Sequence, residues 1–230
     1  MIPGFGEKAQ LRLKRATALI AGLGGLGSPL ALYLAAAGVG HLKLVDMDHV
    51  ELSNLNRQVL HWDKDIGESK VSSAMQKVQR INPTTRVDGL NLTIDDKNVF
   101  ELAENCDIIL DAMDNFSIRY LLNAAAIAHR IPLIHGAVYG YEGRLASVVP
   151  GKTACLECIY PHTPPREVFP VLGTTPGVIA LLQATEAIKA LTGIGVLLEN
   201  EMLIYDGEMM NFEKVRISRS PKCASCSGLS

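Results

Sequence analysis

Short apolar runs alternate with helical segments through the first 140 residues of the chain. A helical segment repeats its apolar positions at a period near 3.6, whereas a fully buried strand is a short continuous apolar run. The alternation is typical of a parallel sheet with helices on both faces, so we expect an α/β fold with a Rossmann-like, mostly parallel sheet. The predicted strands are 16–21, 42–45, 86–92, 108–110 and 133–138, and helices are predicted between them, from 28 to about 38 and at about 68–79, 97–104 and 116–129.

The rhythm of the sequence changes after Gly143. Two cysteines and a proline-rich stretch at 161–176 follow, and the predicted elements are a strand, a long amphipathic helix and two further strands, at 145–149, 177–191, 202–205 and 212–217. We expect these C-terminal strands to be antiparallel. The length suits one domain over residues 1–230, with a first half at 1–140 and a second at 141–230.

The composition mainly excludes classes of partner and of location. A formal net charge of −2 and an aromatic content of 5% predict neither nucleic acid nor an anionic membrane surface as a partner. The stretch from Ala16 to Gly40 carries no charged residue, but its glycines and Pro29 favour a strand–turn–helix over a membrane span. Charged residues before it leave no room for the apolar region of a signal peptide. We therefore expect a cytoplasmic protein.

A glycine-rich turn, Gly22-Leu-Gly-Gly-Leu-Gly27, joins the first predicted strand to the first helix. Glycines allow a tight turn and a close approach of a phosphate to main-chain N–H groups at a helix N-terminus. Asp46 closes the second strand, where a carboxylate can bind ribose hydroxyls. The motif predicts nucleotide binding without separating NAD from ATP, and the alternative is a plain structural turn of an α/β protein.

Further charged residues favour ATP. Arg57 and Lys70 lie in the following polar loop and at the start of the next helix, and two cations suit a triphosphate better than a dinucleotide. Asp111 and Asp114 follow a parallel strand, where a carboxylate can hold Mg²⁺ against phosphates. The alternatives are solvated surface charge for the cations and a helix cap near Phe116 for the acid.

Two C-x-x-C pairs, Cys155/Cys158 and Cys223/Cys226, predict a metal site. Each pair supplies two thiolates from one turn, and four thiolates complete a closed, structural zinc site. A thioredoxin-like redox role is the alternative, but neither pair follows a strand at the start of a helix. Cys106 is interpreted as a packing residue, and the six histidines as surface or core residues.

In their order along the chain, these motifs and several further short sequences resemble those of the ThiF/MoeB/HesA adenylyltransferases, the bacterial relatives of ubiquitin-activating enzymes. The resemblance covers nearly the whole chain. Besides the glycine turn and both cysteine pairs, it rests on AAGVG (36–40), LVDMD (44–48), LSNLNRQ (52–58), IGESK (66–70), INP (81–83), LDAMDN (110–115) and LQATEAIK (182–189).

The resemblance implies an activity and a set of roles. Family members use ATP and Mg²⁺ to adenylylate the C-terminal glycine of a small β-grasp carrier ending in Gly-Gly, and they release pyrophosphate. A sulfur donor such as a cysteine desulfurase then acts on the carrier, for molybdopterin or thiamine synthesis, and the enzymes are homodimers. The implied catalytic residues are Asp114, Arg57 and Lys70, and the implied nucleotide site is Gly25, Asp46, Ser53, Asn54, Arg57, Lys70, Asp114 and Asn115. Residues 1–140 would then bind the nucleotide and 141–230 the carrier and zinc.

Two departures from the family pattern stand out. Members usually begin with a helix bearing R-Y-x-R-Q, whose arginine reaches the partner subunit's ATP, whereas this chain begins at Met1, after the place of that helix. Many members carry a cysteine in the crossover loop; Thr163–Pro176 has none, and Arg166 falls about where it would be. We therefore expect the reaction to stop at the acyl-adenylate. The rival hypotheses are a non-catalytic carrier-binding scaffold and an NAD-dependent oxidoreductase.

Overall fold

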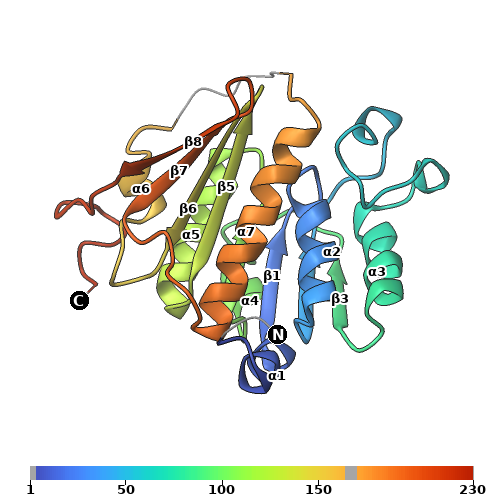
Figure 1. Ribbon diagram of the computed structural model, residues 1–230, viewed down its shortest axis with the longest axis horizontal. Coiled ribbons are helices and arrows are strands. Elements are labelled where there is room, and N and C mark those ends of the chain that lie inside the picture. The colour runs from blue at the N-terminus through green and yellow to red at the C-terminus, as the bar shows by residue number, and fades with distance from the viewer. Residues whose placement is uncertain (1–3, 164–169, 230) are drawn as a thin grey trace.

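The computed structural model describes residues 4–163 and 170–229, and its centre is one eight-stranded sheet in the order β3-β2-β1-β4-β5-β6-β7-β8 (Figure 1). Neighbours from β3 to β5 are parallel and those from β5 to β8 are antiparallel, as expected. The strands are Thr17–Ala21 (β1), His41–Val45 (β2), Arg86–Leu90 (β3), Ile108–Asp111 (β4), Leu133–Tyr139 (β5), Glu142–Val148 (β6), Glu201–Asp206 (β7) and Asn211–Arg216 (β8).

Helices cover both faces of the sheet, as the alternation predicts. One apolar core lies between the sheet and the helices at the front of Figure 1, and a second core lies behind the sheet. The front helices are Glu7–Arg15 (α1), Gly27–Ala37 (α2), Lys70–Ile81 (α3) and Thr174–Thr192 (α7); those behind are Val99–Ala103 (α4), Phe116–His129 (α5) and Leu156–Ile159 (α6). The α/β fold with a mostly parallel sheet and C-terminal antiparallel strands is confirmed.

Two helices were not predicted. The segment of α1, EKAQLRLKR, is short and mostly charged or polar, and only Ala9 and Leu13 are buried among its nine residues. It ends in basic residues that suit a helix C-terminus. The other, α6, is a single turn that follows Cys155 and contains Cys158. Short helices of this kind gain most of their stability from tertiary packing, which periodicity does not report.

The uncharged stretch that could suggest a membrane span is β1 followed by α2. Gly38 ends α2 with φ +90°, a left-handed conformation that glycine adopts without strain. Within 4–163 and 170–229, no helix combines the length and the apolar character that crossing a membrane requires. The expectations for the chain start at Met1 and for Arg166 lie outside the described residues.

Strand order places the candidate site. From β1 the chain moves outward to β2 and β3, and then crosses back to β4 on the other side of β1. The loops that leave β1 and β4 therefore diverge, and ligands of open α/β sheets bind at such a switch point, beyond the carboxyl ends of the strands.

Candidate functional site

The glycine loop 22–27 leaves β1 at this switch point and packs against the turn that follows β4. Gly22 has φ +92°, and a Cβ there would lie 2.7 Å from the carbonyl oxygen of Ala112. A Cβ on Gly27 would lie 1.8 Å from the carbonyl oxygen of Gly22, so neither position has room for a side chain. This close packing sets the loop beside the turn that carries Asp114.

Asp46, predicted to bind ribose, lies at the end of β2 and already binds the glycine loop. Its Oδ2 accepts the main-chain N–H of Leu23 at 2.7 Å, and its Oδ1 accepts that of Asp48 at 2.8 Å. The carboxylate thus fixes the loop and remains half-buried at its edge.

Arg57 also lies against the glycine loop. A Cβ built on Gly25 would lie 3.6 Å from Cγ of Arg57 and 3.1 Å from Pro176, near the start of α7. The Arg57 guanidinium donates to the carbonyl oxygen of Ser53 and to Oδ1 of Asn56, both at 2.9 Å. Its cation is therefore oriented by its own loop, beside Gly25.

Ser53 and Asn54 stabilise the turn before Arg57. Asn54 is 9% exposed, and its Oδ1 accepts the main-chain N–H of Glu51 at 3.2 Å. The exposed Ser53 hydroxyl donates to the Glu51 carboxylate at 3.2 Å. In this structure both side chains serve the local turn.

Lys70 begins α3, and its Nζ lies 2.9 Å from Oδ2 of Asp48. The lysine side chain is 7% exposed, whereas that of Asp48 is 59% exposed. Asp48 closes the run after β2 together with Asp46, so one short segment contacts both the glycine loop and the candidate phosphate lysine.

The two carboxylates after β4 differ sharply. Asp111 is fully buried: its Oδ2 lies 2.6 Å from Nδ1 of His135 and 3.6 Å from Nε of Arg119. Its other oxygen accepts the N–H of Met113 at 3.1 Å, and Arg119 donates to the carbonyl oxygen of Met113. Asp111 therefore holds the turn, and its carboxylate is not available to a metal. Of the two acids predicted to hold Mg²⁺, only Asp114 remains a candidate.

Asp114 is exposed, and its contact in this turn is Nδ2 of Asn115 at 3.3 Å. Asn115, rather than Asp114, caps α5, because its Oδ1 accepts the N–H of Ile118 at 3.0 Å. The helix-cap alternative for Asp114 is therefore wrong, and its carboxylate faces solvent beside the glycine loop.

The four cysteines converge, although the two pairs lie 68 residues apart in sequence. Their sulfur atoms all lie within 4.8 Å of one another, and adjacent Sγ–Sγ distances are 3.5, 3.6 and 3.9 Å. Four Zn–S bonds of about 2.3 Å at a tetrahedral centre place sulfurs about 3.8 Å apart. The residues Cys155, Cys158, Cys223 and Cys226 therefore form a cluster that fits a tetrahedral metal.

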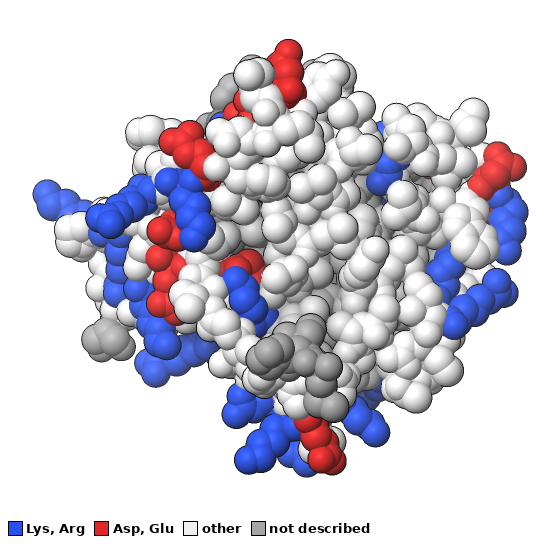
Figure 2. Space-filling view, viewed as in Figure 1, with Lys and Arg blue, Asp and Glu red and all other residues white. Residues whose placement is uncertain are grey.

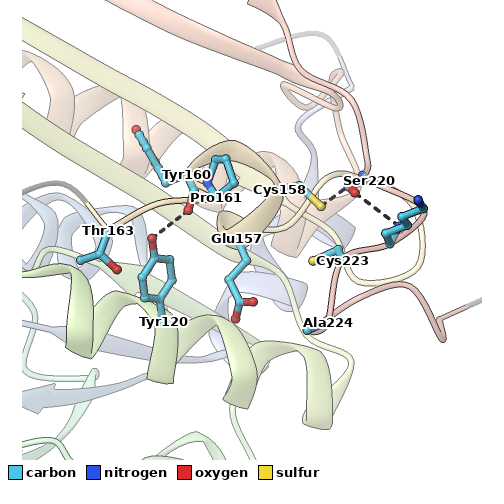
Figure 3. A pocket seen from close by; sticks show the side chains of 10 residues that line it. Tyr120, Glu157, Cys158, Tyr160, Pro161, Thr163, Ser220, Cys223 and Ala224 are labelled. Carbon is cyan, nitrogen blue, oxygen red and sulfur yellow. Dashed lines mark hydrogen bonds between the residues drawn. The ribbon is translucent and has the colours of Figure 1, made fainter.

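A pocket of about 600 Å³ opens beside this cluster (Figure 3). Tyr120 of α5 donates to the carbonyl oxygen of Tyr160 at one wall, and the N–H of Ser220 donates to the Cys158 sulfur at another. The glycine loop does not line it. We do not assign the nucleotide there, because the main-chain N–H groups and cations that phosphates require lie at the switch point.

Sequence reasoning missed three residues that support the site. Asp48 entered the sequence analysis only as the last residue of LVDMD (44–48), while His61 and His135 were interpreted as surface or core residues. Both rings are buried in polar contacts, and burial lowers the pKa of each although a hydrogen-bonded carbonyl or carboxylate opposes the shift. Spacing carries no signal for them, because their partners lie 12 to 38 residues away.

Comparisons with known proteins agree with the motifs. The model of the ThiF family matches residues 1–226. The chain is 40% identical to a sulfur carrier protein adenylyltransferase from Thermus thermophilus, over 98% of this chain and 88% of that protein, and 43% identical to protein HesA from Nostoc, over 98% and 90%. A crystal structure of E. coli MccB with ATP has a TM-score of 0.82 at 26% identity, over 95% of this chain and 68% of that one. The chain therefore belongs to the ThiF family, and the prediction that it is an adenylyltransferase is confirmed.

Proposed function

We propose that the chain uses ATP to adenylylate the C-terminal glycine carboxylate of a small β-grasp carrier ending in Gly-Gly, releasing pyrophosphate, for molybdopterin or thiamine synthesis. The observation that carries the proposal is the packing of the glycine loop against the Asp114 turn, with Asp46 and Arg57 in contact with the same loop. The Thermus relative, named a sulfur carrier protein adenylyltransferase, supports the substrate class.

The roles of the residues follow from charge. The carrier carboxylate attacks the α-phosphorus of ATP, the bond to the bridging oxygen breaks, and negative charge moves onto pyrophosphate. Arg57 and Lys70 stabilise that charge, and the N–H groups of the glycine loop orient the phosphates. Asp46 binds the ribose, while Ser53, Asn54 and Asn115 shape the site around it.

Asp114 is the residue that fits Mg²⁺. A hard divalent cation prefers carboxylate oxygens, and Asp114 is exposed beside the glycine loop while Asp111 is engaged in the core. Mg²⁺ bound there would neutralise phosphate charge, and Asp114 would hold it against the α-phosphate side of the nucleotide.

The cysteine cluster fits Zn²⁺ in a structural role. Four thiolates close the coordination sphere, and the cluster joins the loop before α6 to the C-terminal segment. Residues 141–230 would then hold the zinc and bind the carrier, beside a nucleotide-binding half at 1–140.

We also propose a cytoplasmic homodimer that hands its product to a separate sulfur donor such as a cysteine desulfurase. The central part of the face in Figure 2 is largely uncharged, over the region where Figure 1 shows α2 and α7. Tyr33 of α2 is 55% exposed there and Leu181 of α7 is 38% exposed. An uncharged, partly apolar helical face of this kind suits a second copy of the chain.

Pyrophosphate exchange tests the proposal. Purified protein with Mg²⁺ and a β-grasp carrier ending in Gly-Gly should move label from pyrophosphate into ATP, and a carrier lacking the last glycine should not support exchange. A protein that binds the carrier without exchange would be the non-catalytic scaffold. Binding of NAD in preference to ATP would instead favour the oxidoreductase.

A further inference from the structure

The imidazole of His61 joins the glycine loop to helix α3. The residue is 3% exposed, and both ring nitrogens have partners. Nε2 lies 3.1 Å from the carbonyl oxygen of Leu23, in the glycine loop, and Nδ1 lies 2.8 Å from the hydroxyl of Ser73, in α3. One ring therefore spans two elements of the candidate nucleotide site.

The partners determine the protonation of this ring. A carbonyl oxygen only accepts hydrogen bonds, so Nε2 carries the proton. In the neutral ring Nδ1 then accepts the single proton of the Ser73 hydroxyl, for which Oδ2 of Asp65, 3.2 Å away, is the competing acceptor. Burial lowers the pKa of His61; the Leu23 carbonyl opposes this shift, the charges of Lys77 and Lys70 add to it, and Asp46 opposes it. His61 is thus a neutral bridge that donates to the glycine loop through Nε2 and accepts from α3 through Nδ1.

The far end of the bridge is itself fixed. Lys77 donates to the Ser73 hydroxyl at 2.6 Å and forms an ion pair with Asp65, and these three residues are at most 5% exposed. Asp65 also accepts the main-chain N–H of Trp62, the neighbour of His61, at 2.7 Å. A buried, paired network of this kind holds its members in one arrangement.

Both partners of the His61 ring, Leu23 and Ser73, lie next to groups proposed to bind the nucleotide. Ser73 lies one helical turn after Lys70 in α3, and Leu23 is the residue whose N–H binds Asp46. We propose that His61 is a positioning residue, which holds the glycine loop at a fixed distance from Lys70 so that loop N–H groups and the lysine act on one polyphosphate. This inference rests on the proposed use of ATP.

Two substitutions separate the two bonds of the ring. The amide of Gln can place an N–H where Nε2 lies, whereas that of Asn reaches only the Nδ1 position. His61→Asn should therefore keep the contact with Ser73 and lose the loop, weakening ATP binding about tenfold. His61→Gln should keep the loop bond and bind ATP within about twofold of the wild type. Amide hydrogen exchange of residues 22–27 should rise in His61→Asn only.

Thr85→Val is the matched control. Thr85 is 4% exposed and donates to the carbonyl oxygen of Val39 at 2.9 Å, at the amino end of the strands. Thr85→Val should lower the melting temperature without changing ATP affinity or the amide hydrogen exchange of residues 22–27. An equal loss of ATP affinity in His61→Asn and His61→Gln would overturn the inference. So would an unchanged ATP affinity, or an unchanged amide hydrogen exchange at 22–27, in His61→Asn. Wild-type protein that binds no ATP would instead overturn the proposed function, and exchange at 22–27 would still decide whether His61 holds the loop.

Discussion

Nζ of Lys70 lies 2.9 Å from Oδ2 of Asp48, so the lysine proposed to bind phosphate has a carboxylate partner within the protein. The main-chain N–H of Lys70 also donates to the carbonyl oxygen of Asp48 at 2.9 Å. The lysine is nearly buried, while the carboxylate is largely in solvent. Water can solvate the exposed Asp48 carboxylate when a phosphate takes its place beside Lys70, so this ion pair does not prevent the lysine from binding phosphate.

The first prediction concerns that lysine. Lys70→Ala should lower carrier-dependent ATP–pyrophosphate exchange by about 100-fold or more, as the loss of a group that stabilises transition-state charge does. Because Asp48 is exposed, the substitution leaves no buried charge, and the melting temperature should change little.

Lys43→Ala is its control. Lys43 donates to two main-chain carbonyls, those of Leu102 and Glu104, and therefore also supports the fold through its ammonium group. Carrier-dependent ATP–pyrophosphate exchange should persist in Lys43→Ala. Full exchange in Lys70→Ala would show that the lysine serves only Asp48.

The second prediction separates the two carboxylates after β4. Asp114→Asn should nearly abolish exchange without destabilising the protein, since its side chain is exposed. Asp111→Asn should cost about 3–5 kcal/mol of unfolding free energy, because it breaks a buried pairing with Arg119 and His135. Chemical denaturation and exchange assays measure both. Asp107→Asn, at the amino end of β4, is the control and should exchange normally; wild-type exchange in Asp114→Asn would contradict the assignment.

Much of the fold is readable from sequence because its elements are long or strongly apolar. The strands β1 and β4 are almost fully buried and mostly apolar, and α7 is a long helix of nineteen residues, of which 177–191 was predicted. By contrast α1 buries two residues and was missed. The cysteine pairs were readable because thiolate spacing is a local property, even though their convergence is a long-range one.

The candidate site was readable only in part. Asp46 lies at the end of its strand and binds Leu23 of the glycine turn, and Gly25 lies in that turn beside Arg57. The supporting contacts were not readable, because His61 and Asp111 meet partners brought together by tertiary structure. Acidic residues three positions apart look alike in sequence, and only burial separates Asp111 from Asp114.

The third prediction concerns the cysteine cluster. Purified protein should contain one zinc per chain by elemental analysis, and Cys226→Ser should lower both zinc content and melting temperature. Each kcal/mol lost corresponds to roughly 2–4 °C at this chain length. Cys106→Ser, a buried cysteine outside the cluster, should retain full zinc. Zinc-free protein of unchanged stability, or disulfides within both pairs, would contradict the assignment.

The fourth prediction is a pH dependence. The pKa of His61 in the folded protein is lowered from 6.5, so below that value the unfolded chain binds a proton that the folded protein resists. Stability from this source is present above about pH 6.5 and is lost as pH falls. Between about pH 7.5 and about pH 5.5, wild type should lose more unfolding free energy than His61→Gln, by at most about 1.4 kcal/mol. The cysteine cluster is common to both proteins, so equal slopes would show that folding does not lower the pKa of His61.

The last prediction concerns covalent chemistry. A thioester or persulfide requires an exposed thiolate near the adenylate. Four of the five cysteines lie in the cluster, and the fifth, Cys106, is 7% exposed at the amino end of β4, opposite the glycine loop. Burial raises the pKa of its thiol although Lys43 opposes this shift, so the reactive thiolate is scarce at neutral pH.

Incubation with ATP and the carrier should therefore yield acyl-adenylate and no covalent adduct on a non-reducing gel. Cys106→Ser should form adenylate at the wild-type rate, which mass spectrometry of the carrier can follow. An adduct that dithiothreitol removes, and that survives in Cys106→Ser, would have to come from a cluster cysteine released during turnover. Such an adduct would contradict a purely structural role for the metal site, whereas its absence is what we expect if the reaction of this protein stops at the acyl-adenylate.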